Sequence, residues 1–168
     1  AVNGTGNSVA NILVGNSGAN VLDGGAGDDT LIGGAGNDTY VIDSVVDVMT
    51  EGAGAGTDTV QAALTYSIAT LANVENLTLT GTSAINGTGS AGNNFITGSV
   101  AANTISAGTA GTDALIGGAG DDTYVIDHAG VTVTENAGEG TDLVQSTVVH
   151  ALGANVENLT LTGIANIN

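Results

Sequence analysis

Gly24-Gly25-Ala26-Gly27-Asp28-Asp29-Thr30-Leu31-Ile32 is followed at once by Gly33-Gly34-Ala35-Gly36-Asn37-Asp38-Thr39-Tyr40-Val41, and the pattern returns as Gly117-Gly118-Ala119-Gly120-Asp121-Asp122-Thr123-Tyr124-Val125. Each block has a glycine-rich start, an aspartate at position six and a large apolar residue at position eight. A period of nine residues that ends each time in a short apolar run predicts a turn followed by a strand, coiled into a β-structure.

The residue types in this pattern suit calcium. The carboxylate at position six supplies hard oxygen ligands, which Ca²⁺ prefers. Glycine reaches backbone conformations with positive φ, so that turn carbonyls can point toward an ion. The residue at position eight then starts a strand and points to one face, because side chains alternate along a strand. Two perfect blocks in tandem and a third elsewhere therefore predict calcium-binding turns.

These segments resemble the RTX (haemolysin-type, repeats-in-toxin) family, whose motif is G-G-x-G-x-D-x-U-x with U large and apolar. The resemblance implies a parallel β-roll in which two nonapeptides form one coil, with Ca²⁺ held between turns two repeats apart. It also implies that backbone carbonyls of the turns complete the calcium shell around both aspartates. Members of the family are usually secreted by Gram-negative bacteria, so the resemblance implies an extracellular or cell-surface location.

The nonapeptide frame extends beyond the perfect copies. In the first half, position six is occupied in turn by Asn11, Asn20, Asp29, Asp38, Asp47 and Asp58. In the second half it is occupied by Asn94, Asn103, Asp113, Asp122, Val131 and Asp142. Asparagine keeps a carbonyl oxygen but lacks charge, so the asparagine turns are weaker sites or plain structural turns. Two-residue inserts, Glu51-Gly52 and Glu135-Asn136, interrupt the count in each half.

The sequence predicts metal ligands in the turns of both halves. The predicted carboxylate ligands are Asp29, Asp38, Asp122, Asp113, Asp142, Asp47 and Asp58. The turn residues predicted to contribute through the backbone are Gly24, Gly25, Ala26, Gly27, Gly33, Gly34, Ala35, Gly36, Gly117, Gly118, Ala119 and Gly120. The expected pairs are Asp29 with Asp47, Asp38 with Asp58, and Asp122 with Asp142; the inserts lie between the members of the last two pairs.

A longer repeat is superimposed on the nonapeptides. Ala72–Gly81 recurs unchanged as Ala154–Gly163, so the chain is predicted to hold two tandem units of about 83 residues. The first unit covers 1–83, with calcium-type repeats over 6–61 and threonine-rich rungs over 62–83. The second unit covers 84–168, with calcium-type repeats over 89–145 and threonine-rich rungs over 146–168. The expected fold is all-β, a single continuous β-solenoid or β-roll of roughly nine coils, about 4.8 Å apart.

Composition narrows the function. The chain has 168 residues, no Lys or Arg and 17 acidic residues, which gives a formal charge of −17. Without basic side chains the protein cannot neutralise the phosphates of a nucleic acid, so nucleic-acid binding is excluded. For the same reason the chain is not attracted to an anionic membrane surface. No apolar stretch approaches the roughly 20 residues that span a bilayer. The chain has no Cys, so that metal rather than disulfides is the expected means of stabilisation.

The other polar residues receive more ordinary interpretations. Asp28 and Asp121, at position five, are predicted to be solvated, and Asp23, Asp43 and Asp127 could assist at turn edges. Glu75 and Glu157 occupy matched places in the repeated decapeptide, which leaves a structural hydrogen bond and a second cation site both open. His128 and His150 are interpreted as incidental surface residues. Paired carboxylates could act as a glycosidase acid and base, but carboxylates in regular turns favour metal binding, and no enzyme activity is expected.

Two functions of different kinds fit this sequence. The first is a calcium-stabilised structural module of a secreted or cell-surface protein, such as a filament, an S-layer or an adhesin stalk, which folds on binding calcium. The alternative is the carrier region of a secreted enzyme or toxin whose active domain lies elsewhere. The sequence ends in mid-pattern without a capping motif, and solenoids need caps to stay monomeric. We therefore expect either further repeats or head-to-tail self-association.

Overall fold

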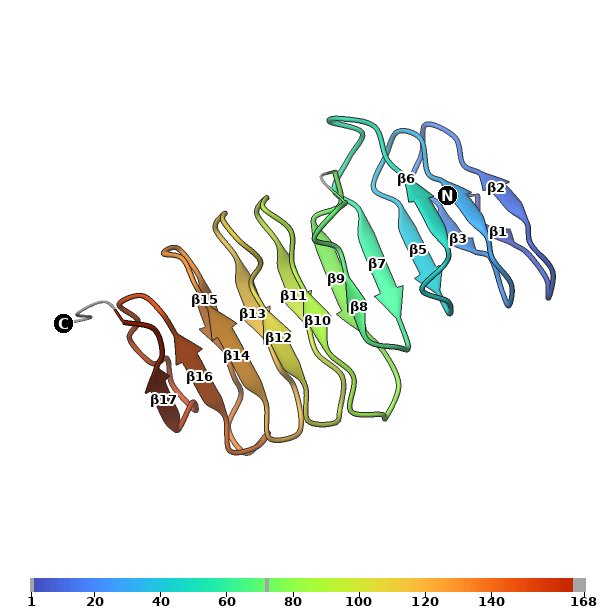
Figure 1. Ribbon diagram of the computed structural model, residues 1–168. Coiled ribbons are helices and arrows are strands. Elements are labelled where there is room, and N and C mark those ends of the chain that lie inside the picture. Colours follow the sequence, from blue (N-terminus) through green and yellow to red (C-terminus); the bar gives the residue numbers. More distant parts are fainter. Residues whose placement is uncertain (1, 72, 165–168) are drawn as a thin grey trace.

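The computed structural model describes residues 2–71 and 73–164, which wind into an elongated solenoid of about nine turns (Figure 1). All pairs between neighbouring strands are parallel, and the predicted all-β solenoid is confirmed. The described residues form no helix, and so none that could cross a membrane. The short strands follow from the sequence, because each glycine-rich turn leaves only a few apolar or β-branched residues before the next turn.

One face of the solenoid is a single sheet of eight strands. In order these are β1 (Gly4–Thr5), β3 (Val21–Asp23), β5 (Thr39–Ile42), β7 (Thr59–Ala62), β9 (Asn76–Leu79), β11 (Phe95–Thr97), β13 (Ala114–Ile116) and β15 (Thr132–Thr134). Each strand lies beside the one formed a full coil later, as the parallel register from Val21 opposite Thr39 to Ala114 opposite Thr132 shows.

The opposite face is divided into two sheets. The first holds β2 (Ile12–Val14), β4 (Thr30–Ile32) and β6 (Val48–Thr50). The second holds β8 (Tyr66–Ser67), β10 (Gly87–Thr88), β12 (Thr104–Ser106), β14 (Thr123–Ile126), β16 (Leu143–Ser146) and β17 (Asn158–Leu161). The division falls between β6 and β8, where a groove of about 480 Å³ is lined by Met49, Tyr66 and Leu71 among others.

The core is a column of apolar side chains contributed by successive strands. Along the eight-stranded sheet, strand register stacks Leu22, Tyr40, Val60, Leu77, Ile96, Leu115 and Val133. All of them are buried. A fully buried side chain of this size stabilises by about 1.5–3 kcal/mol, but each coil supplies few of them. The fold therefore depends on interactions at the turns as well as on its core.

Corresponding parts of the two predicted units lie on opposite faces. The sequence Thr-Tyr-Val-Ile forms β5 in the eight-stranded sheet and returns as β14 on the divided face. From β1 onward the chain changes face at each step from one strand to the next, and nine such steps, an odd number, lead from β1 to its counterpart β10. The turns that precede β5 and β14 therefore lie at opposite edges of the solenoid. The division into units at residue 83 itself stays a prediction from the sequence.

Candidate metal centre

The glycine-rich turns adopt the conformations that their sequence requires. The second and fourth positions have positive φ, for example 104° at Gly34 and 111° at Gly36, a region that glycine enters without steric cost. The first position is needed for space: a Cβ on Gly33 would collide with the carboxylates of Asp38 and Glu51. Gly117 is in the same situation beside Asp122 and Glu135. The first glycine of these turns thus leaves room for a cluster of oxygen atoms.

Position-six side chains form a ladder along one edge of the solenoid, where the turns lead into the eight-stranded sheet. The backbone N–H of Asn20 donates to Asp38 Oδ1 (2.7 Å), 18 residues on. The N–H of Asp38 donates to Asp58 Oδ1 (2.7 Å), 20 residues on. The N–H of Asp58 donates to Glu75 Oε2 (2.8 Å), 17 residues on. The insert after β6 does not interrupt this ladder. Each hydrogen bond joins one turn to the equivalent turn of the next coil, whatever the number of residues in that coil.

The opposite edge carries the same kind of ladder. The N–H of Asp29 donates to Asp47 Oδ1 (3.0 Å) in the first half. In the second half the N–H of Asp122 donates to Asp142 Oδ1 (2.9 Å), and that of Asp142 donates to Glu157 Oε2 (2.8 Å). Glu75 and Glu157 therefore occupy the place of position-six residues. The structure shows both as hydrogen-bond acceptors in the ladders.

Asparagine and aspartate turns use their side chains differently. Asn20 Oδ1 closes its own turn by accepting from the N–H of Asn16 (2.9 Å), and its Nδ2 donates to the carbonyl of Val2 (2.6 Å). In the aspartate turns one carboxylate oxygen accepts the ladder bond, while Asp29 Oδ2, Asp38 Oδ2 and Asp122 Oδ2 are buried with no hydrogen-bond partner in the described part of the chain. A buried, unpaired carboxylate oxygen is strongly unfavourable without a cation or a proton. The Asn20 side chain is thus used within the fold, whereas the aspartate turns leave an oxygen that fits an ion.

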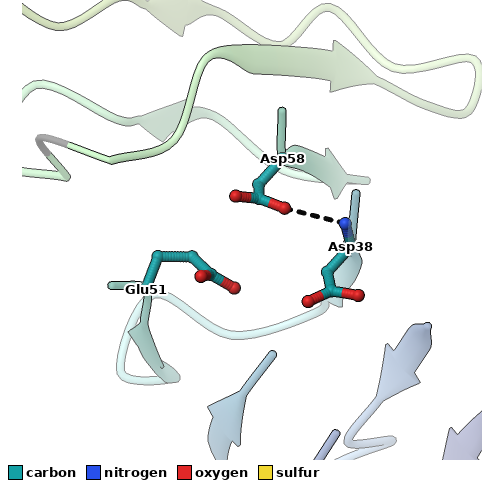
Figure 2. A group of neighbouring side chains, drawn as sticks. All are labelled: Asp38, Glu51 and Asp58. Carbon is teal, nitrogen blue, oxygen red and sulfur yellow. Dashed lines mark hydrogen bonds between the residues drawn. The ribbon is translucent and has the colours of Figure 1, made fainter. Parts of the chain in front are cut away.

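Two clusters bring three carboxylates together. Asp38, Glu51 and Asp58 each offer one oxygen within 4.8 Å of the others, and Figure 2 shows the three carboxylates converging from separate segments. Asp122, Glu135 and Asp142 repeat the arrangement. In each cluster a buried tyrosine hydroxyl, of Tyr40 or Tyr124, donates to the glutamate. Oxygen donors alone make up these clusters, which is the donor set that suits Ca²⁺.

The clusters change the acidity of their members. Burial, as the largest cause, raises the pKa of Asp58 and that of Asp122 to about 6. Burial followed by the charges of Asp142 and Asp122 raises the pKa of Glu135 to about 7. Burial also raises the pKa of the Tyr40 hydroxyl, and its hydrogen bond to Glu51 adds to the rise. These carboxylates are hard to ionise in the absence of a cation, because they lie close together and away from water.

The predicted carboxylate ligands are all buried: Asp29, Asp38, Asp47, Asp58, Asp113, Asp122 and Asp142. Each predicted pair is joined by a ladder bond. Asp28 and Asp121 are exposed, as expected. The roles of these aspartates and of the turn backbones as metal ligands stay predictions from the sequence.

His128 differs from the expectation of an incidental surface residue. Its Nε2 lies 2.8 Å from Asp113 Oδ2, and its Nδ1 lies 2.8 Å from Asp127 Oδ1. Burial lowers the pKa of His128, but the hydrogen bonds to the two aspartates outweigh burial, and the net shift is upward from 6.5. The sequence did not reveal this contact, because the buried partner of His128, Asp113, lies 15 residues away.

Comparison with known proteins supports this assignment of the turns. The family model of the RTX calcium-binding nonapeptide repeat (4 copies) matches residues 5–40 and 88–124. These two stretches are RTX calcium-binding nonapeptide repeats. The match indicates Ca²⁺-binding structural repeats in these two stretches, and the RTX repeat is typical of secreted proteins. No curated protein matches the chain.

The third carboxylate of each cluster lies outside the matched RTX stretches, and the sequence reasoning missed it. Glu51 and Glu135 directly follow β6 and β15 and belong to the inserts that were interpreted as interruptions. A signal was present: each glutamate lies 11 residues after a position-eight tyrosine. The inserts do not separate the aspartate pairs, since they supply a third carboxylate to each.

Proposed function

We propose that this chain is a calcium-dependent structural module of a secreted or cell-surface protein, without catalytic activity of its own. The supporting observation is the set of buried position-six carboxylates whose second oxygens have no hydrogen-bond partner among the described residues. These acids lie at both edges of a thin solenoid in a chain with no Lys or Arg. Calcium bound between successive coils would remove the repulsion that opposes folding.

The residues that would hold calcium are the paired position-six aspartates and the carbonyls of their turns. Bound Ca²⁺ supplies positive charge that compensates the clustered carboxylates. The ladder bonds place the two carboxylates of each pair one coil apart, so that one ion would join successive coils. Metal binding then becomes folding free energy. The chain would be largely disordered in a low-calcium cytoplasm and would fold in the millimolar calcium outside the cell.

Continuation of the solenoid is the second part of the proposal. At its far end β17 pairs with β16, and its leucines Leu159 and Leu161 are exposed. An open strand edge with exposed apolar residues is a template for further pairing. We propose that further repeats or another copy of the chain cover this edge. If another copy does so, the contact is head to tail and builds fibres rather than closed rings.

Far-UV circular dichroism with millimolar Ca²⁺ and then with excess EGTA tests the calcium-dependent fold. We expect a β-signal with calcium and its loss with chelator; the same β-signal in both would overturn the proposal. Electron microscopy of the calcium form then separates the proposed assemblies. Filaments support a self-assembling structural protein, whereas dispersed particles that unfold in EGTA favour a stalk segment or the carrier region of a secreted enzyme or toxin.

A further inference from the structure

We propose that each unit contains a cation site of a second kind, in which the insert glutamate is the third carboxylate ligand and a tyrosine hydroxyl closes the inner wall. One site is formed by Asp38, Glu51 and Asp58, and the other by Asp122, Glu135 and Asp142. The inference rests on the proposed calcium-dependent fold. It adds to the aspartate pairs a ligand that the nonapeptide motif does not contain.

The first argument is convergence. An ideal Cβ built on Gly117 would collide with Asp122 Oδ2, the Tyr124 hydroxyl and Glu135 Oε1, so that these three oxygens surround one point. The same holds at Gly33 for Asp38 Oδ2, the Tyr40 hydroxyl and Glu51 Oε1. The oxygens come from separate elements: a turn, the strand that follows it, and the end of a strand on the opposite face. Their agreement in both halves marks a repeated arrangement of oxygen atoms rather than a chance approach of acids.

The second argument is unsatisfied hydrogen bonding. In the second cluster Asp122 Oδ2 and Glu135 Oε2 are buried and have no hydrogen-bond partner in the described part of the chain. The same is true of Asp38 Oδ2 in the first cluster. Glu135 Oε1 accepts from Tyr124 and from the N–H of Gly117 (3.2 Å). One side of the glutamate is thus fixed by the protein, while the other oxygen is left for a ligand. A divalent cation with six to eight oxygen ligands satisfies such a cluster.

The third argument is a contrast within the chain. Gly24 occupies the same turn position as Gly33, yet the three atoms nearest to a Cβ there all belong to Asp29, and no glutamate or tyrosine oxygen is among them. Position eight of that repeat is Leu31 instead of tyrosine. The glutamate cluster thus accompanies tyrosine at position eight, which gives the site a sequence pattern: aspartate, tyrosine two residues later, glutamate 11 residues after the tyrosine, and a second aspartate seven residues after the glutamate.

Terbium luminescence tests this site directly, because Tb³⁺ takes calcium ligands and is excited through a nearby tyrosine. The chain has no Trp and three Tyr residues. Tyr40 and Tyr124 touch the clusters, whereas Tyr66 lines the groove between β6 and β8. We expect tyrosine-sensitised emission that Ca²⁺ displaces. Y40F and Y124F should each remove about half of it, while Y66F should leave it unchanged.

Glutamate variants then test the ligand itself. E51Q should weaken Tb³⁺ binding at the site reported by Tyr40 by about tenfold or more, and E135Q should do so at the site reported by Tyr124. Each single variant keeps the other site as an internal check that the solenoid is folded. D28N is the matched control, since it removes one exposed acid from a neighbouring turn.

The possible failures are distinguishable. If calcium folds the chain but tyrosine-sensitised emission is absent, or if E51Q and E135Q bind Tb³⁺ as tightly as D28N does, the glutamate site is wrong and the proposed function stands. If calcium induces no β-structure in the parent chain, the proposed function itself is wrong.

Discussion

The tetrapeptide Asn-Leu-Thr-Leu occurs twice in this solenoid with opposite burial. In β9 its leucines Leu77 and Leu79 are 0% and 2% exposed, whereas in β17 Leu159 and Leu161 are 37% and 51% exposed. The strand β9 pairs with β7 on one side and β11 on the other, but β17 pairs with β16 alone among the described strands. Burial in this fold is therefore conferred by the neighbouring coil and not by local sequence, as expected for a solenoid whose repeats contact only their neighbours.

Alanine substitutions at the matched leucines should give the largest difference. Leu77→Ala leaves a cavity between two coils and is expected to cost about 2–5 kcal/mol. Leu159→Ala is expected to cost about 1 kcal/mol or less, since its side chain is partly in water already. Urea unfolding in saturating calcium measures both. Equal costs would contradict the comparison, and a cost at Leu159 that grows with protein concentration would show that another copy covers this edge.

The two halves also differ at one aspartate pair. In the first half Asp29 lies one coil from Asp47, and the N–H of Ser44 donates to Asp47 Oδ2 (3.2 Å). In the second half Val131 stands where Asp47 would be, and His128 stands where Ser44 would be. There the imidazole reaches Asp113 instead. The imidazole of His128 thus contacts Asp113 in the second half, whereas in the first half Asp29 pairs with Asp47 at a proposed metal site.

Reciprocal exchange of these residues should move one calcium ion. The double variant S44H/D47V should bind one ion fewer, and H128S/V131D should bind one more. At calcium a hundredfold above Kd, an ion contributes about 2.7 kcal/mol, so that the urea midpoints in calcium should shift in opposite directions. Calorimetric titration counts the ions. Unchanged counts in both variants would show that Asp29 and Asp47 do not form a site.

Protonation of the clustered carboxylates at low pH should partly replace calcium in stabilising the fold, and the stabilisation should be larger in the second cluster. The pKa of Glu135 is raised to about 7, and those of Asp58 and Asp122 to about 6. The folded state therefore binds more protons than the unfolded chain between these values and the ordinary carboxyl pKa near 4. Metal-free protein should gain stability as pH falls from about 7 toward 4.5, and its calcium affinity should fall over the same range.

The glutamine variants sharpen this pH comparison. E135Q mimics the protonated acid and should stabilise the metal-free fold at neutral pH by about 1–2 kcal/mol, since it relieves an unpaired buried charge. E51Q should do less, because Glu51 is partly exposed. Circular dichroism of chelated protein against pH provides the measurement. A metal-free β-signal that does not change between neutral pH and pH 5 would contradict this account.

Much of this architecture follows from the sequence period, and the parts that do not have a common physical reason. The nonapeptide frame predicted the solenoid and which position-six aspartates lie one coil apart, because ladder bonds join equivalent turns. The frame did not predict that Glu51 and Glu135 join the aspartate clusters. Each of them directly follows a strand of the opposite face, which ends at the edge where the aspartate turn lies. The frame also failed for Glu75, which takes a position-six place in the ladder without a glycine-rich turn before it. A nine-residue repeat in the sequence does not indicate which residues from opposite faces of the solenoid contact each other.

The smallest expected effect concerns His128. Its pKa is raised in the folded state, so that the stabilisation from the Asp113 contact is fully present below pH 6.5 and is lost as pH rises through the folded value. We expect H128N to cost about 1 kcal/mol or less at pH 5.5, the range of a partly exposed ion pair, and almost nothing at pH 8.5. Urea midpoints of parent and variant at both pH values, in saturating calcium, give this difference, and S44N is the matched control in the first half. A loss of stability that is the same at both pH values would mean that the imidazole acts by packing, in which case His128 is no substitute for a cation.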